Sequence, residues 1–492
     1  MANNRRKYGK IKKVIKFGGS CLKDRSSLLQ AVSIIKKENE RVALVVSALS
    51  GVTDLLLDAY HLALGQEKNF RGIINSIEKR HLLLASEVLS LKNYALLAER
   101  YRELFFRLNR LLRGIALSGE ASTSLKAAVL SYGERLSAHL LAVILNEAGL
   151  EARVYESEKA GLVATRVSEE AEADLEAFDR VFRTAAGEVE AGNFIPVFTG
   201  FYGLTPEGRT ALFGRNGSDY TAACVARGFR ALRLVLYKDV PGFLTADPEK
   251  VPEARPIPAL SRLEAAELSY FGAKILHPRI WEPLEPLNCP VEIKSFKSPE
   301  APGTVIKAKA EKSANIIKSL SASENLAVLR VEGPGVGSKP GIIGLLGTTL
   351  ARNEVNILTV LTSQTCINLI LSASEGERAL RLVEKIQEPA IRKVLLEKDL
   401  ALVAAVGHGI RETDGLAGKI FSTLGSARIN VEFFSTGASE TAIYLLLKKS
   451  DTGRAVRLLH QAFFGEKTEG RKRSLPPGSA VELHHRQVID TR

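Results

Sequence analysis

The sequence predicts an α/β protein: a doubly wound, mainly parallel sheet over about the first 300 residues, followed by a smaller duplicated unit. Three observations support this class. The chain has 492 residues, which is too long for one compact core and indicates roughly two or three domains. Apolar segments with strand character alternate with helical segments in the first part. In the second part, a set of residues recurs at a fixed offset.

The first strand is expected at 13–19 (KVIKFGG) and the second at 41–49 (RVALVVSAL), with a helix over 26–39 between them. This βαβ order predicts parallel strands, and the uninterrupted apolar second strand indicates a sheet covered on both faces. The segment 54–112 is rich in leucine and charge without a strand signal, so it is expected to be helical. Later strands, separated by helices, are expected at 149–157, 194–203 and 232–240.

The sequence pattern changes after the proline-rich segment SPEAPGT at 298–304. Beyond it, several residues reappear 74 positions later, which indicates an internal duplication of strand, glycine turn, helix and strand. Residues 465–492 lack an apolar pattern and are expected to form a mobile tail. The repeated residues are Gly333, Gly335, Gly341, Gly344, Thr349, Leu350, Asn356 and Thr362, matched by Gly407, Gly409, Gly415, Gly418, Thr423, Leu424, Asn430 and Thr436.

The composition is that of an ordinary soluble protein, with 45% hydrophobic and 25% charged residues. The net charge of +13 favours anionic partners, either nucleic acid or nucleotide phosphates. We expect no nucleic acid, because the sequence shows no aromatic or helix-in-groove elements for it. The 4 cysteines are scattered, which disfavours zinc or disulfides and fits a reducing cytoplasm. No signal peptide and no apolar run of about 18 residues is found, so no membrane contact is expected.

Two motifs directly follow the first two strands. In KFGGS, Gly18 and Gly19 can point backbone N–H groups at an anion, and Lys16 adds a positive charge beside them. The alternative is a tight turn with an exposed lysine. In SALSGVT, the hydroxyls of Ser47 and Thr53 stand beyond a strand's carboxyl end, where open α/β sheets bind ligands. A serine cap on the next helix explains them equally well.

Three later motifs carry charged side chains. In GRNGSDYTAA, the fork of Arg215 can grip a carboxylate, while Ser218 and Asp219 can cap a helix that faces the same ligand. Capping explains either of the last two residues, but not an arginine between glycines. In SYGERLS, Glu134 opens an amphipathic helix, where the helix dipole alone favours a carboxylate. In ELSYFGAKILHPR, Lys274 can reach a phosphate or only a surface carboxylate.

These motifs, together with FTGFYG and DVPGFLTADP and taken in their order, resemble aspartate kinases of the amino-acid kinase superfamily. The repeat resembles their paired ACT domains, each with a βαββαβ, ferredoxin-like fold. RNGSDY and ELSYFGAKILHPR are most similar to the kinase half of bifunctional aspartokinase–homoserine dehydrogenases. The chain contains no dehydrogenase part, so that second activity is not expected. The resemblance covers 13–464 and implies a catalytic domain at 1–305, a first ACT domain at 324–398, and a second at 399–464 with a strand from 311–323.

The resemblance implies transfer of the γ-phosphoryl group of ATP to the β-carboxylate of L-aspartate, the first step toward lysine, threonine and methionine. A carboxylate with an ordinary pKa of about 3.9 needs no general base, so catalysis must come from positioning and charge neutralisation. The implied catalytic residues are Lys16, Gly18, Gly19 and Asp219. The residues implied to bind aspartate are Ser47, Thr53, Glu134, Phe201, Arg215 and Ser218, with Glu134 at the ammonium and Arg215 at the α-carboxylate. Those implied to bind ATP, whose phosphates Mg²⁺ would bridge, are Lys16, Lys238, Asp239, Leu244 and Lys274.

The chain departs from the family pattern mainly in the nucleotide loop. Lys238 stands where a threonine is usual, Leu244 where a tyrosine is usual, and Glu249 where an arginine is usual. A glutamate near the triphosphate weakens binding by charge, whereas Lys238 can restore a cation. Two alternatives therefore stay open: a non-catalytic amino-acid sensor with a decayed kinase domain, and another acyl-phosphate-forming amino-acid kinase. The ACT pair and ELSYFGAKILHP argue against the second alternative.

By resemblance, the ACT domains bind an amino-acid effector, and threonine, lysine, both or neither stay open. The segment VNILTVLTSQT lacks the acidic residue that lysine-sensitive relatives carry near Leu358. It has Thr362 where threonine-sensitive relatives tend to have glutamine. ACT pairing usually takes two chains, so a cytoplasmic homodimer or homotetramer is expected.

Overall fold

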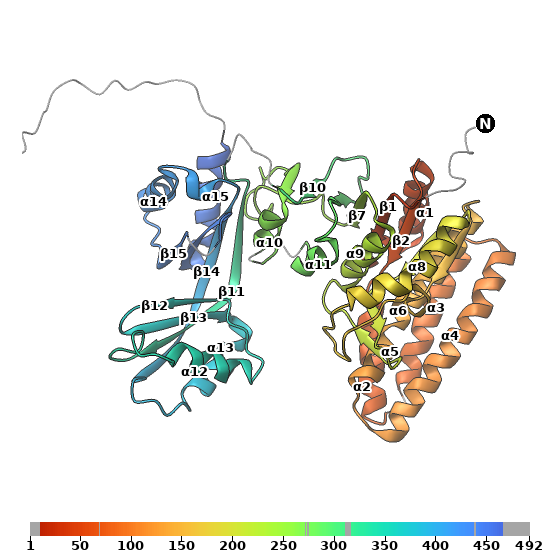
Figure 1. Cartoon of the computed structure of the whole chain (residues 1–492), viewed down its shortest axis with the longest axis horizontal. Coiled ribbons are helices and arrows are strands. Elements are labelled where there is room, and N and C mark those ends of the chain that lie inside the picture. The colour runs from red at the N-terminus through yellow and green to blue at the C-terminus, as the bar shows by residue number, and fades with distance from the viewer. Residues whose placement is uncertain are drawn as a thin grey trace, which may run out of the picture.

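Residues 10–67, 69–270, 272, 275–309, 316–436 and 439–465 are described by a computed structural model of the chain. Figure 1 shows an α/β half, coloured red to green, beside a half rich in long strands, coloured green-blue to blue. The expected mobile tail lies outside the described residues except for residue 465, and so does Lys274.

An eight-stranded sheet forms the centre of the α/β half, with β1 (Lys13–Phe17) between β2 (Val42–Val46) and β7 (Arg233–Lys238). Both of these pairs are parallel. β10 (Thr304–Lys307) runs antiparallel to β9 (Val291–Ser295), so the sheet is mainly parallel, as predicted. The other strands are β3 (Ala152–Tyr155), β4 (Ile195–Thr199) and β8 (Ala259–Ser261), in the order β3-β4-β2-β1-β7-β9-β10-β8.

Helices cover both faces of this sheet, because alternate residues of its strands point to opposite sides. Val14 belongs to the core with Phe178 and Ala222, whereas Ile15 belongs to the core with Leu28 and Leu136. This is the predicted doubly wound arrangement. The core that contains Val14 also includes residues of the helices α8 (Leu175–Ala191), α9 (Gly217–Phe229), α10 (Arg262–Tyr270) and α11 (Trp281–Leu284). The core that contains Ile15 includes residues of the helices α1 (Arg25–Lys37), α2 (Val52–Leu64), α3 (Phe70–Ser86), α4 (Leu91–Ser118), α5 (Thr123–Leu130) and α6 (Tyr132–Glu147).

Within the described residues, one helical stretch is long and apolar enough to cross a bilayer, contrary to the expectation that the chain has none. It runs over Thr123–Glu147, which contains α5 and α6. Its most apolar window is 72% buried inside the α/β half. The apolar character therefore follows from packing against the sheet and the neighbouring helices, as in the core helix of a folded domain.

The second half is built on a six-stranded antiparallel sheet, ordered β12-β13-β11-β14-β16-β15. The long strands β11 (Ser319–Glu332) and β14 (Lys393–Val406) run through both repeats, and their register shifts near Leu326. The first repeat adds α12 (Ile342–Ala351), β12 (Thr359–Thr362), β13 (Cys366–Ser372) and α13 (Ala373–Val383). The second adds α14 (Leu416–Ser426), β15 (Phe433–Ser435), β16 (Ala442–Lys448) and α15 (Thr452–Phe464).

Each repeat forms a βαββαβ unit, and the two units share β11 and β14. The first unit uses the second part of β11 as its first strand and the first part of β14 as its last. The second unit begins with the rest of β14, and residues 319–323 of β11 complete its sheet. The predicted ferredoxin-like fold of the repeats is therefore confirmed.

The repeated glycines have equivalent structural roles in the two units. Gly341 and Gly415 precede α12 and α14 with φ angles of 92° and 76°, a region that favours glycine. A Cβ at Gly333 would lie 1.9 Å from the Ala390 carbonyl oxygen. A Cβ at the matching Gly407 would lie 1.7 Å from the carbonyl oxygen of Ile316, which precedes β11. The duplication thus preserves backbone contacts that no side chain permits.

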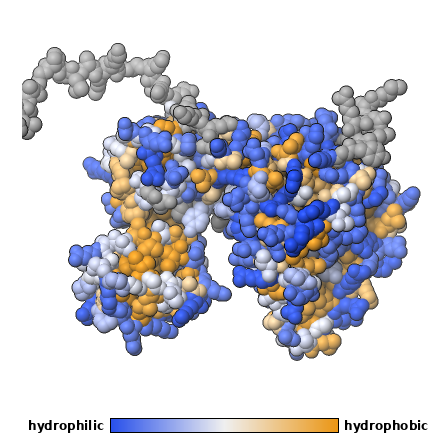
Figure 2. Space-filling model, in the orientation of Figure 1, coloured by the Kyte–Doolittle hydropathy of each residue, from blue (hydrophilic) through white to orange (hydrophobic). Residues whose placement is uncertain are grey.

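Hydrophobic residues gather on the surface of the lobe that carries β12 and β13, as Figure 2 shows. On this lobe Val360 is 37% exposed, and Ile343 and Leu345 of α12 are also exposed. Such a gathering on an otherwise polar surface is typical of a contact face.

The two halves are joined by polar contacts at the start of β11. Lys318 Nζ lies 3.0 Å from Glu264 Oε2 of α10, with side-chain exposures of 7% and 0%. The Ser319 hydroxyl donates to the Leu244 carbonyl over 2.7 Å, and the Leu320 N–H donates to the Thr245 carbonyl over 2.9 Å. The C-terminal sheet is therefore bonded directly to the loop that follows β7.

Replacing Lys318 with methionine is expected to lower the free energy of unfolding by about 3–5 kcal/mol, because Glu264 would keep a buried charge without its partner. Urea denaturation of the full chain measures this. The exposed pair Lys398–Glu377, 2.6 Å apart, offers a matched control. Lys398→Met is expected to cost less than about 1 kcal/mol. Equal effects of the two substitutions would contradict the structural importance of the buried pair.

Candidate functional site

A buried carboxylate bound by two lysines lies at the carboxyl edge of the parallel sheet. Lys16 Nζ is 2.7 Å from Asp219 Oδ1, and Lys238 Nζ is 2.7 Å from Asp219 Oδ2. Lys16 comes from β1 and Lys238 ends β7, so the parallel pairing of these strands brings both ammonium groups to one edge. Asp219 is 1% exposed in the first turn of α9. The sequence thus places two cations around one anion at the start of a helix.

The electrostatics of this cluster are set by burial and by attraction between its members. Burial alone would raise the pKa of Asp219, but Lys16 and Lys238 outweigh it and hold that pKa below its usual value. Burial also lowers the pKa of Lys238, with attraction to Asp219 opposing this effect. The cluster carries two positive charges and one negative charge, so it can receive a further anion.

The glycine turn after β1 lies directly beside Lys16. A Cβ at Gly18 would lie 3.6 Å from Lys16 Nζ, and a Cβ at Gly19 would lie 2.7 Å from the Ala48 carbonyl oxygen. Glycine at position 19 therefore lets this turn approach the loop after β2, which carries Ser47. The glycine turn of the KFGGS motif therefore lies next to the Lys16 ammonium group.

Glu134 is buried in the first turn of α6 with an incomplete set of partners. Its Oε1 accepts the Ala48 N–H over 3.1 Å, while Oε2 has no hydrogen-bond partner among the described residues. Burial raises the pKa of Glu134 to about 8, against the opposing effects of the Ala48 hydrogen bond and Lys16. An ammonium group at Oε2 would supply the missing partner and stabilise the ionised form.

The start of α9 packs against the turn after β4. Phe201 has a φ of 76°, which is rare for a side chain of this size, and its N–H donates to Thr221 Oγ1 over 3.1 Å. A Cβ at Gly200 would lie 2.7 Å from Ser218 Cβ. These contacts place Phe201 and Ser218 beside each other, and the Gly200 N–H donates to the Val46 carbonyl at the end of β2.

The remaining candidate residues lie farther out. Arg215 is exposed and has no partner in the described part of the chain, and Asn216 after it has a φ of 58°. Thr53 is half-buried in the first turn of α2. Leu244 does not join the lysine cluster, because its carbonyl is bonded to Ser319 of the C-terminal sheet. Lys274 lies outside the described residues.

A cavity of about 440 Å³ lies beside the glycine turn and is lined by Ser20 and Asp239 together with Lys23 and Lys297. The sequence analysis did not include these two lysines. Lys23 follows the glycine motif closely, and Lys297 follows the end of β9 at the same edge of the sheet. Both lysines come soon after the end of a strand in the sheet, and this position in the sequence could have identified them as candidate site residues. Asp24 and Asp239 line the same cavity and balance the charge of the two lysines, so a phosphate there would depend on direct contact with Lys23 or Lys297.

A preformed metal site is absent from the described residues, because no group of three or more His, Cys, Asp or Glu side chains occurs there. Both oxygens of Asp219 are already paired with lysines. Asp239 is exposed and lines the cavity. This donor set fits an ion such as Mg²⁺ that enters with a phosphate ligand and takes one carboxylate from the protein.

Family profiles and known proteins that are similar to this chain agree with one another. The sequence profile of the amino acid kinase family matches residues 12–295, and that of an ACT domain matches residues 403–463. Chloroplastic aspartokinase 2 of Arabidopsis thaliana is 30% identical over 470 residues, covering 92% of this chain and 84% of the relative. A bifunctional aspartokinase/homoserine dehydrogenase of Haemophilus influenzae is also 30% identical, covering 92% of this chain and 57% of its own length. The chain spans about half the length of the bifunctional relatives it matches.

Solved structures show the same fold. Aspartokinase III of E. coli, in complex with aspartate and ADP, aligns with a TM-score of 0.77 at 28% identity. The alignment covers 92% of this chain and 100% of that structure. Aspartokinase III in complex with lysine and aspartate gives a TM-score of 0.77 as well, at 28% identity, covering 92% of this chain and 99% of that structure.

Glu134 is expected to make the stability of the chain fall as pH rises from about 4.5 to about 8. In this window the folded chain keeps a proton that the unfolded chain has already lost, so deprotonation favours unfolding. Glu134→Gln removes this titration. The melting temperature of the variant, relative to the unsubstituted chain, is therefore expected to rise between about pH 5 and about pH 8.

Thermal melts at several pH values test this prediction, with the exposed Glu120→Gln as the control. A constant difference in melting temperature across the pH range would show that Glu134 titrates normally. A pH trend of the same size in Glu120→Gln would show that the effect is not specific to Glu134.

Proposed function

This chain belongs to the amino acid kinase family and resembles its aspartokinases over most of its length, and we propose that it is an aspartate kinase. The proposed reaction transfers the γ-phosphoryl group of ATP to the β-carboxylate of L-aspartate. The observation that carries the proposal is the buried Lys16–Asp219–Lys238 cluster next to Glu134, a carboxylate with an unpartnered oxygen. The match to aspartokinase III, solved with aspartate and ADP, supports it.

The chain offers a complementary group for each end of aspartate. Glu134 Oε2 suits the ammonium, because a buried carboxylate without a partner gains most from a cation. Arg215 suits the α-carboxylate through a bidentate pair. Ser47 and Phe201 stand on loops at this edge, and Thr53 and Ser218 lie in the first turns of α2 and α9. With these residues around the substrate, the β-carboxylate would be directed toward the lysine cluster.

Phosphoryl transfer between two anions needs positive charge more than acid–base chemistry. The aspartate β-carboxylate is already ionised at neutral pH, so no general base is required. Lys16 and the N–H groups of Gly18 and Gly19 would neutralise the charge on the transferring group. Asp219 holds both lysines in place before either substrate binds, so little reorganisation is needed at the moment of reaction.

ATP would approach over the glycine turn, with its phosphates toward Lys16 and Lys238. The cavity with Ser20, Lys23 and Lys297 could receive the remaining phosphate charge. Mg²⁺ would neutralise charge on the phosphates, and Asp239 is the carboxylate suited to hold it. Lys238 supplies a cation at this edge, which compensates for Glu249, an exposed glutamate where relatives carry an arginine.

The alternative of a non-catalytic amino-acid sensor receives less support. A decayed site would not be expected to keep Lys16 and Asp219 as a buried pair, because burying charges costs free energy. Another acyl-phosphate-forming kinase is disfavoured by the paired ACT units. We also propose that lysine or threonine acts as an effector, as the complex of aspartokinase III with lysine suggests. The exposed apolar lobe around Val360 fits a homodimer or homotetramer, which we place in the cytoplasm.

The proposal predicts ADP release from MgATP that depends on L-aspartate, with the acyl phosphate trapped as its hydroxamate. Glutamate in place of aspartate is expected to give little turnover, because its longer side chain would displace the reacting carboxylate. The assay is run with and without lysine and threonine. L-Aspartate binding without any turnover would favour the sensor, and turnover with glutamate instead would favour the other kinase class.

Replacing Arg215 with alanine is expected to raise the KM for aspartate by roughly 10- to 100-fold, since a charged hydrogen-bonded pair is lost. The KM for ATP should change little. Steady-state kinetics with each substrate varied in turn measure both constants. The exposed Arg180 of α8 provides the control, and Arg180→Ala should leave both constants near their original values. Equal increases in the two constants would remove Arg215 from the aspartate site.

A further inference from the structure

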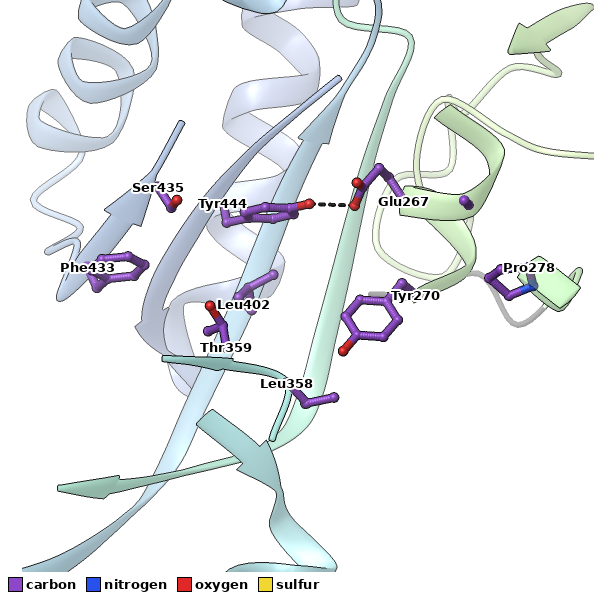
Figure 3. Close-up of a pocket in the computed structure, with 10 residues that line it drawn as sticks. Glu267, Tyr270, Pro278, Leu358, Thr359, Leu402, Phe433, Ser435 and Tyr444 are labelled. Carbon is purple, nitrogen blue, oxygen red and sulfur yellow. Dashed lines mark hydrogen bonds between the residues drawn. The ribbon is translucent and has the colours of Figure 1, made fainter. Parts of the chain in front are cut away.

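A second cavity, of about 290 Å³, lies between α10 and the open face of the C-terminal sheet. Figure 3 shows its two walls: Glu267, Tyr270 and Pro278 come from the α/β half, and strands of the C-terminal sheet stand opposite. Figure 3 also shows the hydroxyl of Tyr270 pointing toward the strand that carries Thr359. The cavity is thus formed within a single chain.

Both repeats contribute to this cavity through equivalent positions. Thr359 in β12 and Phe433 in β15 are separated by the repeat offset of 74 residues, and both line the cavity. Leu402 of β14, which is 1% exposed, lies on the same wall. A molecule bound here would therefore touch the two units and α10 at once.

The lining has a distinct chemical character. Glu267 is the one charged side chain among the described residues that line the cavity, and its carboxylate accepts a hydrogen bond from the Tyr444 hydroxyl. Among the described residues, no lysine, arginine or histidine lines the cavity, so its described lining offers no cation to a phosphate. Thr359 and Ser435 bring hydroxyls that have no partner among the described residues. Leu402 and Phe433 supply an apolar wall.

We propose that this cavity binds one zwitterionic amino acid with an apolar side chain. Its ammonium would pair with Glu267, and its carboxylate would accept hydrogen bonds from the hydroxyls of Thr359 and Ser435. The apolar side chain would pack against Leu402 and Phe433. Lysine fits less well, because the single carboxylate leaves its second ammonium unpaired. Threonine fits less well because its small side chain would leave the apolar wall uncovered.

Resting on the proposed function, the cavity is also placed to influence the sheet edge where ATP would bind. Glu264, one turn before Glu267 in α10, pairs with Lys318 at the start of β11. The next residue, Ser319, holds the Leu244 carbonyl in the loop after β7. A ligand that bridges α10 and the sheet would therefore restrict the motion of that loop.

Isothermal titration calorimetry of the full chain, without ATP or aspartate, tests the proposal with leucine, phenylalanine, lysine and threonine at millimolar concentration. Leucine or phenylalanine is expected to bind. Glu267→Gln should raise its Kd by about tenfold or more, as expected when an ammonium loses its charged partner. Thr359→Phe, which fills the cavity from a half-buried edge strand, should abolish binding.

Glu377→Gln, an exposed substitution on α13, is the matched control and should leave binding unchanged. The proposal is overturned if neither apolar amino acid binds, or if binding survives both cavity substitutions. It is also overturned if lysine or threonine binds more tightly than either apolar amino acid and loses that binding in Glu267→Gln and Thr359→Phe. Because the measurement needs no catalysis, a chain that lacks kinase activity would still give a clear answer.

Discussion

The burial of Asp219 is the constraint on which the rest of the site depends. A carboxylate that is 1% exposed is strongly unfavourable unless cations compensate it, and here Lys16 and Lys238 both do so. Those lysines must come from neighbouring strands whose ends meet at one edge, and β1 and β7 satisfy this through their parallel pairing. The helix that carries Asp219 must begin at the same edge. Strand order, helix placement and charge are thus linked by one electrostatic requirement.

Glu134 represents the opposite arrangement a short distance along the same edge. Asp219 is neutralised by the protein itself, whereas one oxygen of Glu134 is left without a partner. The buried, unpaired carboxylate lowers the stability of the unliganded chain, and a bound ammonium would recover that free energy. An ammonium bound at Glu134 would therefore gain affinity by removing an unfavourable burial that the unliganded chain carries.

Much of the fold was predictable because its signals are local. The strands at 13–19 and 41–49 carry continuous apolar runs, and two of the repeated glycines, Gly333 and Gly407, mark positions where a Cβ would collide with a carbonyl oxygen. The residue types of the site were predictable from ordered motifs. Their partners were not, since the pairing of Lys238 with Asp219 depends on long-range strand order. The contact of Leu244 with β11 was missed for the same reason, because it joins segments far apart in the chain.

The sharing of β11 between the two repeats has a consequence for the order in which the chain is made. Residues 319–323 leave the ribosome well before residues 402–406, the strand segment with which they pair. The α/β half can fold as soon as its own strands have emerged, because domains generally fold as units during synthesis. The second repeat cannot close its sheet until translation has passed the first repeat entirely. Completion of the C-terminal half is therefore a late event, and a chain interrupted between the repeats would carry an unpaired strand segment next to a finished α/β half.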